Sequence, residues 1–137
     1  MIVTAFRRLL PARHGAVLDA IGETVQFLSG CDLTPRTRNA VELAVEELLS
    51  NVSKYAYPAG NPGEVELTIE AGTDGIRVEV VDSGPPFDPT AAPPPAPVSL
   101  EAASGGRGLF LVRSVSRSMR YRRDGNRNIT VVEFPPA

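Results

Sequence analysis

Glu47 and Asn51 are the two residues whose types and spacing could do chemistry together. They stand four positions apart, so a helix would place both on the same side. A carboxylate can accept a proton, and a neutral amide oxygen can hold Mg²⁺. The same spacing is also typical of a solvated polar pair on an ordinary amphipathic helix, and this segment alone favours that simpler interpretation.

The segment around this pair has the periodicity of an amphipathic helix. With a step of about 100° per residue, its apolar side chains form one continuous arc. The arc consists of Val41, Ala44, Val45, Leu48, Leu49, Val52, Tyr55 and Ala56. Glu47 and Asn51 fall just beside its edge, so we expect them to border a core. Thr34 followed by Pro35 is a favoured helix start, and we expect the helix to run to about Tyr57.

A second candidate motif begins at Asp82. Residues 65–71 and 76–82 alternate apolar and polar side chains on either side of a glycine-bounded turn. This pattern predicts a β-hairpin with one buried and one solvent-exposed face. The alternation places Asp82 on the buried side, where a carboxylate is costly unless it is hydrogen-bonded. Such an acceptor suits the exocyclic amine of adenine, and Gly84 would let backbone approach the ring. An Asp-Ser-Gly turn at a strand end is also common without any ligand.

A third candidate motif is the glycine run at residues 105–108, before an expected helix. Bare N–H groups and the helix dipole at such an entrance attract phosphate, although a lone glycine run is weak evidence and also fits a hinge. The run follows residues 85–97, which hold seven of the 13 prolines. We therefore expect a long loop from Pro89 to Ser104, and long loops in compact domains are usually lids or binding loops.

Simpler patterns predict the other elements. Residues 2–10 fit an edge strand that ends at a proline, and residues 12–29 fit a helix stopped by Gly30. After the glycine run, apolar residues at helical spacing predict a helix. Residues 119–123 and 128–134 fit a closing hairpin.

Length and composition limit the class of protein. A chain of 137 residues, 42% hydrophobic and 22% charged, fits one globular domain, which we take to span residues 1–137. No stretch approaches the roughly 20 apolar residues of a membrane span, and the start lacks the order of a secretory signal, so we expect a cytoplasmic location. The single Cys31 cannot form an internal disulfide, and no Cys/His cluster could hold zinc.

The arginines are unevenly distributed. Residues 107–127 contain seven arginines and one acid, which makes this stretch a candidate anion-facing surface. Some of these arginines could equally solvate the outer face of a helix and a hairpin. Nucleic-acid binding is a weaker interpretation still, because the whole chain has a pI near 5.4 and no aromatic-basic RNA motif.

Together, in this order, the three motifs resemble the GHKL ATPase superfamily of gyrase, MutL, histidine kinases and the anti-sigma-factor serine kinases. The resemblance covers about residues 34–134. Residues 47–51 are similar to the N-box, residues 82–84 to the adenine-binding box and residues 106–109 to the second glycine box. The resemblance implies the Bergerat fold, an α/β (α+β) two-layer sandwich in which about three helices cover one face of a mixed, mostly antiparallel sheet.

Within that superfamily, the chain most resembles the small kinases of the RsbW and SpoIIAB type. Glu47 stands where sensor histidine kinases typically carry Asn, and residues 106–113 resemble the serine-kinase branch. Two features depart from that branch. Lys54-Tyr55 resembles the histidine-kinase N-box, and Pro86 stands where many members have the second glycine of the adenine box.

The resemblance implies a role for each motif. Glu47 would be the general base for a serine or threonine hydroxyl, Asn51 would bind Mg²⁺, and Asp82 would bind the adenine of ATP or ADP. Lys54 and Arg107 would contact phosphates, or would simply be solvent-exposed charges. The implied nucleotide-binding positions are Asn51, Lys54, Asp82, Gly84, Gly106, Arg107, Gly108 and Leu109.

By the same resemblance, the protein would be an ATP-dependent protein serine/threonine kinase and anti-sigma factor of a partner-switching system. It would phosphorylate a STAS-domain anti-anti-sigma protein, sequester a sigma factor or similar regulator, and form a homodimer, without contacting nucleic acid or membrane directly. Two alternatives stay open: a non-catalytic, nucleotide-regulated binding module, and a detached histidine-kinase catalytic domain. An intact Glu47 favours the kinase, because binding alone does not require a base.

Overall fold

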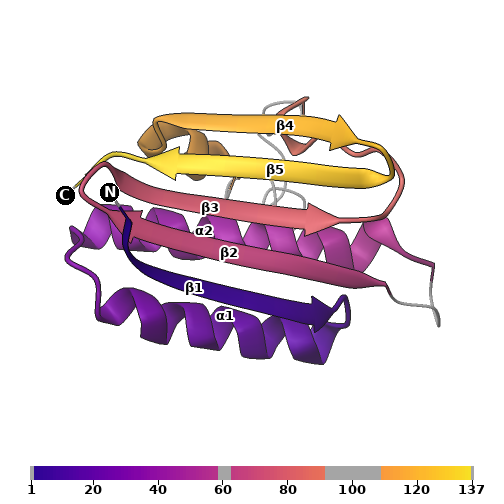
Figure 1. Cartoon of the computed structure of the whole chain (residues 1–137), viewed down its shortest axis with the longest axis horizontal. Coiled ribbons are helices and arrows are strands. Elements are labelled where there is room, and N and C mark those ends of the chain that lie inside the picture. Colours follow the sequence, from indigo (N-terminus) through magenta and orange to yellow (C-terminus); the bar gives the residue numbers. More distant parts are fainter. Residues whose placement is uncertain (1, 59–62, 92–108, 137) are drawn as a thin grey trace, which may run out of the picture.

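The described part of the chain forms a five-stranded sheet with helices packed on one face. The computed structural model describes residues 2–58, 63–91 and 109–136. In chain order the elements are β1 (Ile2–Pro11), α1 (His14–Ser29), α2 (Pro35–Asn51), η1 (Val52–Ala56), β2 (Glu64–Gly72), β3 (Gly75–Asp82), η2 (Pro89–Ala91), β4 (Ser118–Asp124) and β5 (Arg127–Phe134), and residues 109–115 are also helical. Figure 1 shows α1 and α2 side by side behind the sheet. No helix in these three segments is long and apolar enough to cross a lipid bilayer.

The strand order is β1-β2-β3-β5-β4, and all four neighbouring pairs are antiparallel. In the sequence, α1 and α2 connect β1 to β2, and the two helices run in opposite directions (Figure 1). β2 therefore enters the sheet antiparallel to β1. β3 and β4 run in the same direction, but β5 lies between them. The expected two-layer α/β sandwich is therefore confirmed. Its sheet is antiparallel throughout instead of mixed, because the strands that run parallel are not neighbours.

The capping residues place α2 as expected. The Thr34 hydroxyl accepts a hydrogen bond from the Thr37 N–H at 3.2 Å, and Pro35 occupies the first position of the helix. α1 ends at Gly30, as expected, but with φ -89°, so this end does not use the left-handed conformation that glycine allows. The expected edge strand is β1, which among the described strands pairs only with β2.

The core lies between the inner face of the sheet and the helices. Its fully buried apolar side chains include Leu28, Val41, Val45, Leu49, Leu67, Ile69, Val78, Val112, Val132 and Phe134. Towards one end of the same inner face the side chains become polar. There Asp82 pairs with Asn128 across β3 and β5, and Thr130 pairs with Val80. All three polar residues are buried, so this end of the core requires internal hydrogen bonds.

Candidate functional site

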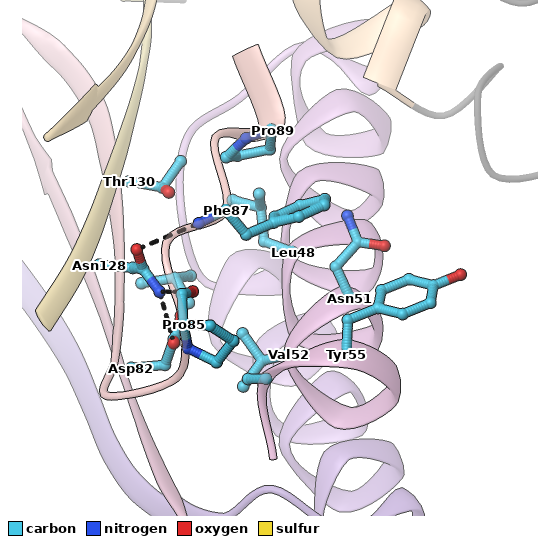
Figure 2. Close-up of a pocket in the computed structure, with 12 residues that line it drawn as sticks. Leu48, Asn51, Val52, Tyr55, Asp82, Pro85, Phe87, Pro89, Asn128 and Thr130 are labelled. Carbon is cyan, nitrogen blue, oxygen red and sulfur yellow. Dashed lines mark hydrogen bonds between the residues drawn. The ribbon is translucent and has the colours of Figure 1, made fainter. Parts of the chain in front are cut away.

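A pocket at this polar end brings Asn51 and Asp82 together (Figure 2). It is lined by Leu48, Asn51, Val52, Tyr55, Ala56, Val80, Asp82, Pro85, Phe87, Pro89, Asn128 and Thr130. The walls come from α2 and η1 on one side and from β3, β5 and the turn after β3 on the other. Two motifs that are distant in sequence therefore share one site.

The pocket is small. Its cavity of about 30 Å³ is far smaller than the roughly 300–1,000 Å³ of typical small-molecule sites. The rings of Tyr55 and Phe87 stack beside it with centroids 6.2 Å apart and an angle of 24° between the ring planes. Both rings are partly exposed, at 62% and 46%. A cavity of this size does not hold a purine base unless the lining side chains move.

Glu47 lies one turn before Asn51 on α2 and is half-buried, whereas neighbouring Glu46 is exposed, as the helical arc predicts. Glu47 is not part of the pocket lining. Burial raises the pKa of its carboxyl, the negative charge of Glu46 raises it further, and Lys54 lowers it. A carboxylate with reduced solvation holds a proton more strongly, so Glu47 can act as a base. Lys54 itself is exposed.

The helix changes type directly after Asn51. α2 is regular up to this residue, and η1 continues as a π-helix over the next turn. π-Helical turns are rare and occur frequently at functional sites. Their wider turn changes the angular step, which explains why Tyr55 is exposed although the 100° projection placed it in the buried arc. That part of the sequence prediction was wrong, while Val52 is buried as expected.

Asp82 ends β3 with only 9% of its surface exposed, so the predicted burial is confirmed. Its Oδ1 accepts hydrogen bonds from the Gly84 N–H at 2.8 Å and from Asn128 Nδ2 at 2.9 Å. These bonds offset the cost of burying the carboxylate.

Gly84 is required at its position because it packs against η1. A Cβ there would lie 2.5 Å from the Ala56 carbonyl oxygen and 2.8 Å from Ala56 Cα, distances that real contacts do not allow. The sequence suggested that this glycine lets backbone approach a ligand ring. In the structure, the backbone that approaches it is that of η1.

Sequence reasoning did not identify Asn128 and Thr130, which line the pocket from β5. A signal was available, because the alternation of β5 puts both on the inner face with Val132 and Phe134, where apolar residues are expected. Two polar residues on a buried face opposite a buried Asp indicate a polar site.

The third motif lies mostly outside the described residues. Gly106, Arg107 and Gly108 belong to the range 92–108, as does most of the expected loop from Pro89 to Ser104. Leu109, the first described residue after that range, is buried at 7% exposure and does not line the pocket.

The described start of the loop is hydrogen-bonded to the helix at residues 109–115. Pro89 to Ala91 form the short 3₁₀ turn η2. The Arg113 guanidinium donates to the carbonyl of Pro89 at 3.0 Å and to that of Thr90 at 2.8 Å.

The donor chemistry fits Mg²⁺ held together with a nucleotide. Within residues 2–58, 63–91 and 109–136, no group of three or more His, Cys, Asp or Glu side chains could hold a metal ion. Mg²⁺ usually takes one or two protein oxygens and completes its shell with phosphate oxygens and water. The Asn51 amide oxygen suits that role, since Asn51 lies in the pocket wall.

Comparisons with known proteins agree with this architecture. The family described as the histidine kinase-like ATPase domain matches residues 10–134. The serine/threonine-protein kinase BtrW of Bordetella bronchiseptica is 34% identical over 99 residues, which cover 70% of each chain. The serine-protein kinase RsbW of Bacillus licheniformis is 26% identical over 100 residues, which cover 69% of this chain and 62% of that protein.

Two solved structures share the fold. The structure of the RsbU and RsbW domains of Rv1364c from Mycobacterium tuberculosis superposes with a TM-score of 0.71 at 12% identity, over 97% of this chain and 32% of that one. The blue-light activated histidine kinase EL346 of Erythrobacter litoralis superposes with a TM-score of 0.57 at 21% identity, over 92% of this chain and 42% of that one. The chain thus spans less than half the length of either solved protein.

Proposed function

Because the chain belongs to the family of histidine kinase-like ATPase domains, we propose that it is an ATP-dependent protein serine/threonine kinase of a partner-switching system. Family membership implies binding of ATP or ADP. The names of BtrW and RsbW support serine or threonine as the acceptor. In this proposal the kinase phosphorylates a STAS-domain anti-anti-sigma protein and, as a homodimer, sequesters a sigma factor or similar regulator.

The observation that carries the proposal is the environment of Glu47. It is a half-buried carboxylate with a raised pKa, one helical turn before Asn51. Phosphoryl transfer to a hydroxyl needs the nucleophile to be positioned and its proton to be accepted. A module that only binds nucleotide has no use for a base at this point.

The proposed reaction assigns a step to each part of the site. Glu47 accepts the hydroxyl proton as the acceptor oxygen bonds to the γ-phosphorus of ATP. The bond to the bridging oxygen between the β- and γ-phosphorus breaks, and ADP leaves. Asp82 holds the adenine amine, and Lys54 with residues 106–108 contacts the phosphates. Mg²⁺, when bound at Asn51, would neutralise phosphate charge.

Two glutamine variants test the proposal. We expect Glu47→Gln to lose at least about 100-fold in phosphoryl transfer, because the isosteric amide cannot accept a proton. ATP affinity, measured by calorimetry, should stay within about twofold, since Glu47 contributes no contact to the pocket. Glu46→Gln is the matched control, because it changes an exposed neighbour of the same chemistry.

The result that would contradict this assignment is also specific. If transfer survived in Glu47→Gln and was lost in Glu46→Gln, the base would lie on the other side of α2. If both variants transferred phosphate at the wild-type rate, neither glutamate would be the base.

A further inference from the structure

Asn128 is the most connected polar side chain of the site. It is 3% exposed and stands opposite Asp82 in the register of β3 and β5. Its Nδ2 donates to Asp82 Oδ1 and to the Pro85 carbonyl, each at 2.9 Å (Figure 2). It also donates to the Gly84 carbonyl at 3.3 Å. One side chain therefore links the carboxylate to the turn that follows it.

The opposite side of the same amide faces donors. Asn128 Oδ1 accepts from the Tyr121 hydroxyl, from Arg123 Nη1 at 3.1 Å and from the Phe87 N–H at 3.4 Å. Because one side of the amide meets only donors and the other only acceptors, its orientation is unambiguous. Arg123 also donates to the Gly84 carbonyl at 2.7 Å, so β4 supports the same turn.

These bonds determine which oxygen of Asp82 is available to a ligand. Within the described residues, both donors to this carboxylate, Gly84 N–H and Asn128 Nδ2, bind Oδ1. Asp82 lines the pocket, and no donor of the described residues bonds its Oδ2, so Oδ2 can accept a hydrogen bond from a ligand. An ionised carboxylate only accepts hydrogen bonds, and its rotation about the Cβ–Cγ bond is held by the two donors on Oδ1.

We propose that Asn128 is a positioning residue that sets the preference of the pocket for 6-aminopurine over 6-oxopurine nucleotides. This inference rests on the nucleotide binding in the proposed function. With Oδ1 held by Asn128, Oδ2 presents a fixed acceptor that matches the exocyclic amine of adenine. The oxygen at the same place in hypoxanthine or guanine would meet it as acceptor against acceptor, which leaves a buried polar group unpaired.

The test compares ATP with inosine triphosphate (ITP), which carries an oxo group where ATP carries the 6-amino group. Affinities of wild type and Asn128→Ala for both nucleotides are measured by calorimetry. We expect wild type to bind ATP at least about tenfold more tightly than ITP, because one hydrogen bond to a charged group typically contributes at least that factor to affinity. Asn128→Ala should lower ATP affinity more than ITP affinity and so reduce the ratio of the two affinities, because only the Gly84 N–H then holds Oδ1.

Tyr121→Phe provides a second, smaller change at the same place. It removes only the hydroxyl that supports Asn128 and leaves the contact between Asn128 and Asp82 in place. Its ratio of ATP to ITP affinity should fall between those of wild type and Asn128→Ala. Thr24→Ala is the control, because Thr24 is equally buried but bonds the Ala20 carbonyl within α1, away from the site. It should lower the unfolding temperature and leave the ratio unchanged.

Each outcome decides a separate question. If Asn128→Ala and Tyr121→Phe lower both affinities equally, or leave the ratio unchanged, the role of Asn128 in specificity is overturned while ATP binding stands. A wild type that binds ATP and ITP equally would overturn the same inference, because Asp82 would not distinguish an amine. A wild type that binds neither nucleotide would refute the proposed function itself. Should Asn128→Ala fail to fold, the ratio in Tyr121→Phe decides alone.

Discussion

Glu47 illustrates how the environment of one residue, more than its type, supports a catalytic role. Burial raises the pKa of its carboxyl, with Glu46 adding to the shift and Lys54 opposing it. The sequence predicted the position of Glu47 beside the buried arc, since helical periodicity alone determines it. It could not predict the raised pKa, which depends on the packing around α2.

The same environment predicts the pH dependence of phosphoryl transfer. A general base acts when deprotonated, so the raised pKa places the rising limb of the rate at higher pH than an exposed glutamate would give. Lys54→Gln removes a positive charge and should move this limb to still higher pH. Glu46→Gln removes a negative charge and should move it to lower pH. The measurement is the transfer rate against pH at saturating ATP for all three proteins.

In that experiment, the position of the limb matters and not the height of the plateau, because Lys54 is also a proposed phosphate contact. A limb that stays in place in both variants, or moves in the same direction in both, would contradict Glu47 as the group that titrates.

Asp82 and Asn128 show which features of the site strand patterns in the sequence can predict and which they cannot. Strand alternation predicted that Asp82 faces inward, and the structure confirms it. The partner Asn128 lies 46 positions further along the chain. That pairing depends on β5 lying beside β3, which alternation within one strand does not reveal.

Among the elements, η1 and the turn after β3 pack directly against each other at Gly84 and Ala56. The start of α2 follows from Thr34 and Pro35, and both β-hairpins follow from alternation around short turns. The π-helical turn did not follow from the sequence, because the apolar spacing up to Ala56 also fits a regular α-helix. The exposure of Tyr55 is the direct consequence.

Gly84→Ala tests this contact. The new Cβ would lie 2.5 Å from the Ala56 carbonyl oxygen, so η1 or the turn must shift. We expect a loss of about 1–3 kcal/mol in the free energy of unfolding, together with weaker ATP binding, because Asp82 and the η1 wall belong to the same pocket. Denaturant unfolding and calorimetry measure the two effects.

Gly22→Ala is the matched control for that variant. Gly22 lies within α1, and a Cβ there meets nothing within 4 Å. Alanine should therefore stabilise the helix by about 0.5–1 kcal/mol and leave ATP binding unchanged. If Gly84→Ala behaved like Gly22→Ala, the packing of the turn against η1 would not matter for the site.

For the whole molecule, the resemblance of three short motifs predicted the two-layer sandwich and the family. The order of the strands came only from the structure. β5 lies between β3 and β4, so the sheet is antiparallel where a mixed sheet was expected. The same position of β5 places Asn128 and Thr130 in the pocket wall. The architecture thus joins α2, β3 and β5 at one end of the core, where the proposed nucleotide site lies one helical turn from Glu47.

The proposed transfer of a phosphoryl group from ATP to a serine or threonine of another protein can be measured directly. The most direct measurement incubates wild type and Glu47→Gln with γ-labelled ATP, Mg²⁺ and a STAS-domain protein from the same organism. We expect wild type to label the STAS protein and the variant to label it at least about 100-fold less, and the label to survive acid. Label that is lost in acid, as from phosphohistidine, would contradict transfer to serine or threonine. Absence of label on the STAS protein with wild type would contradict the proposed kinase activity.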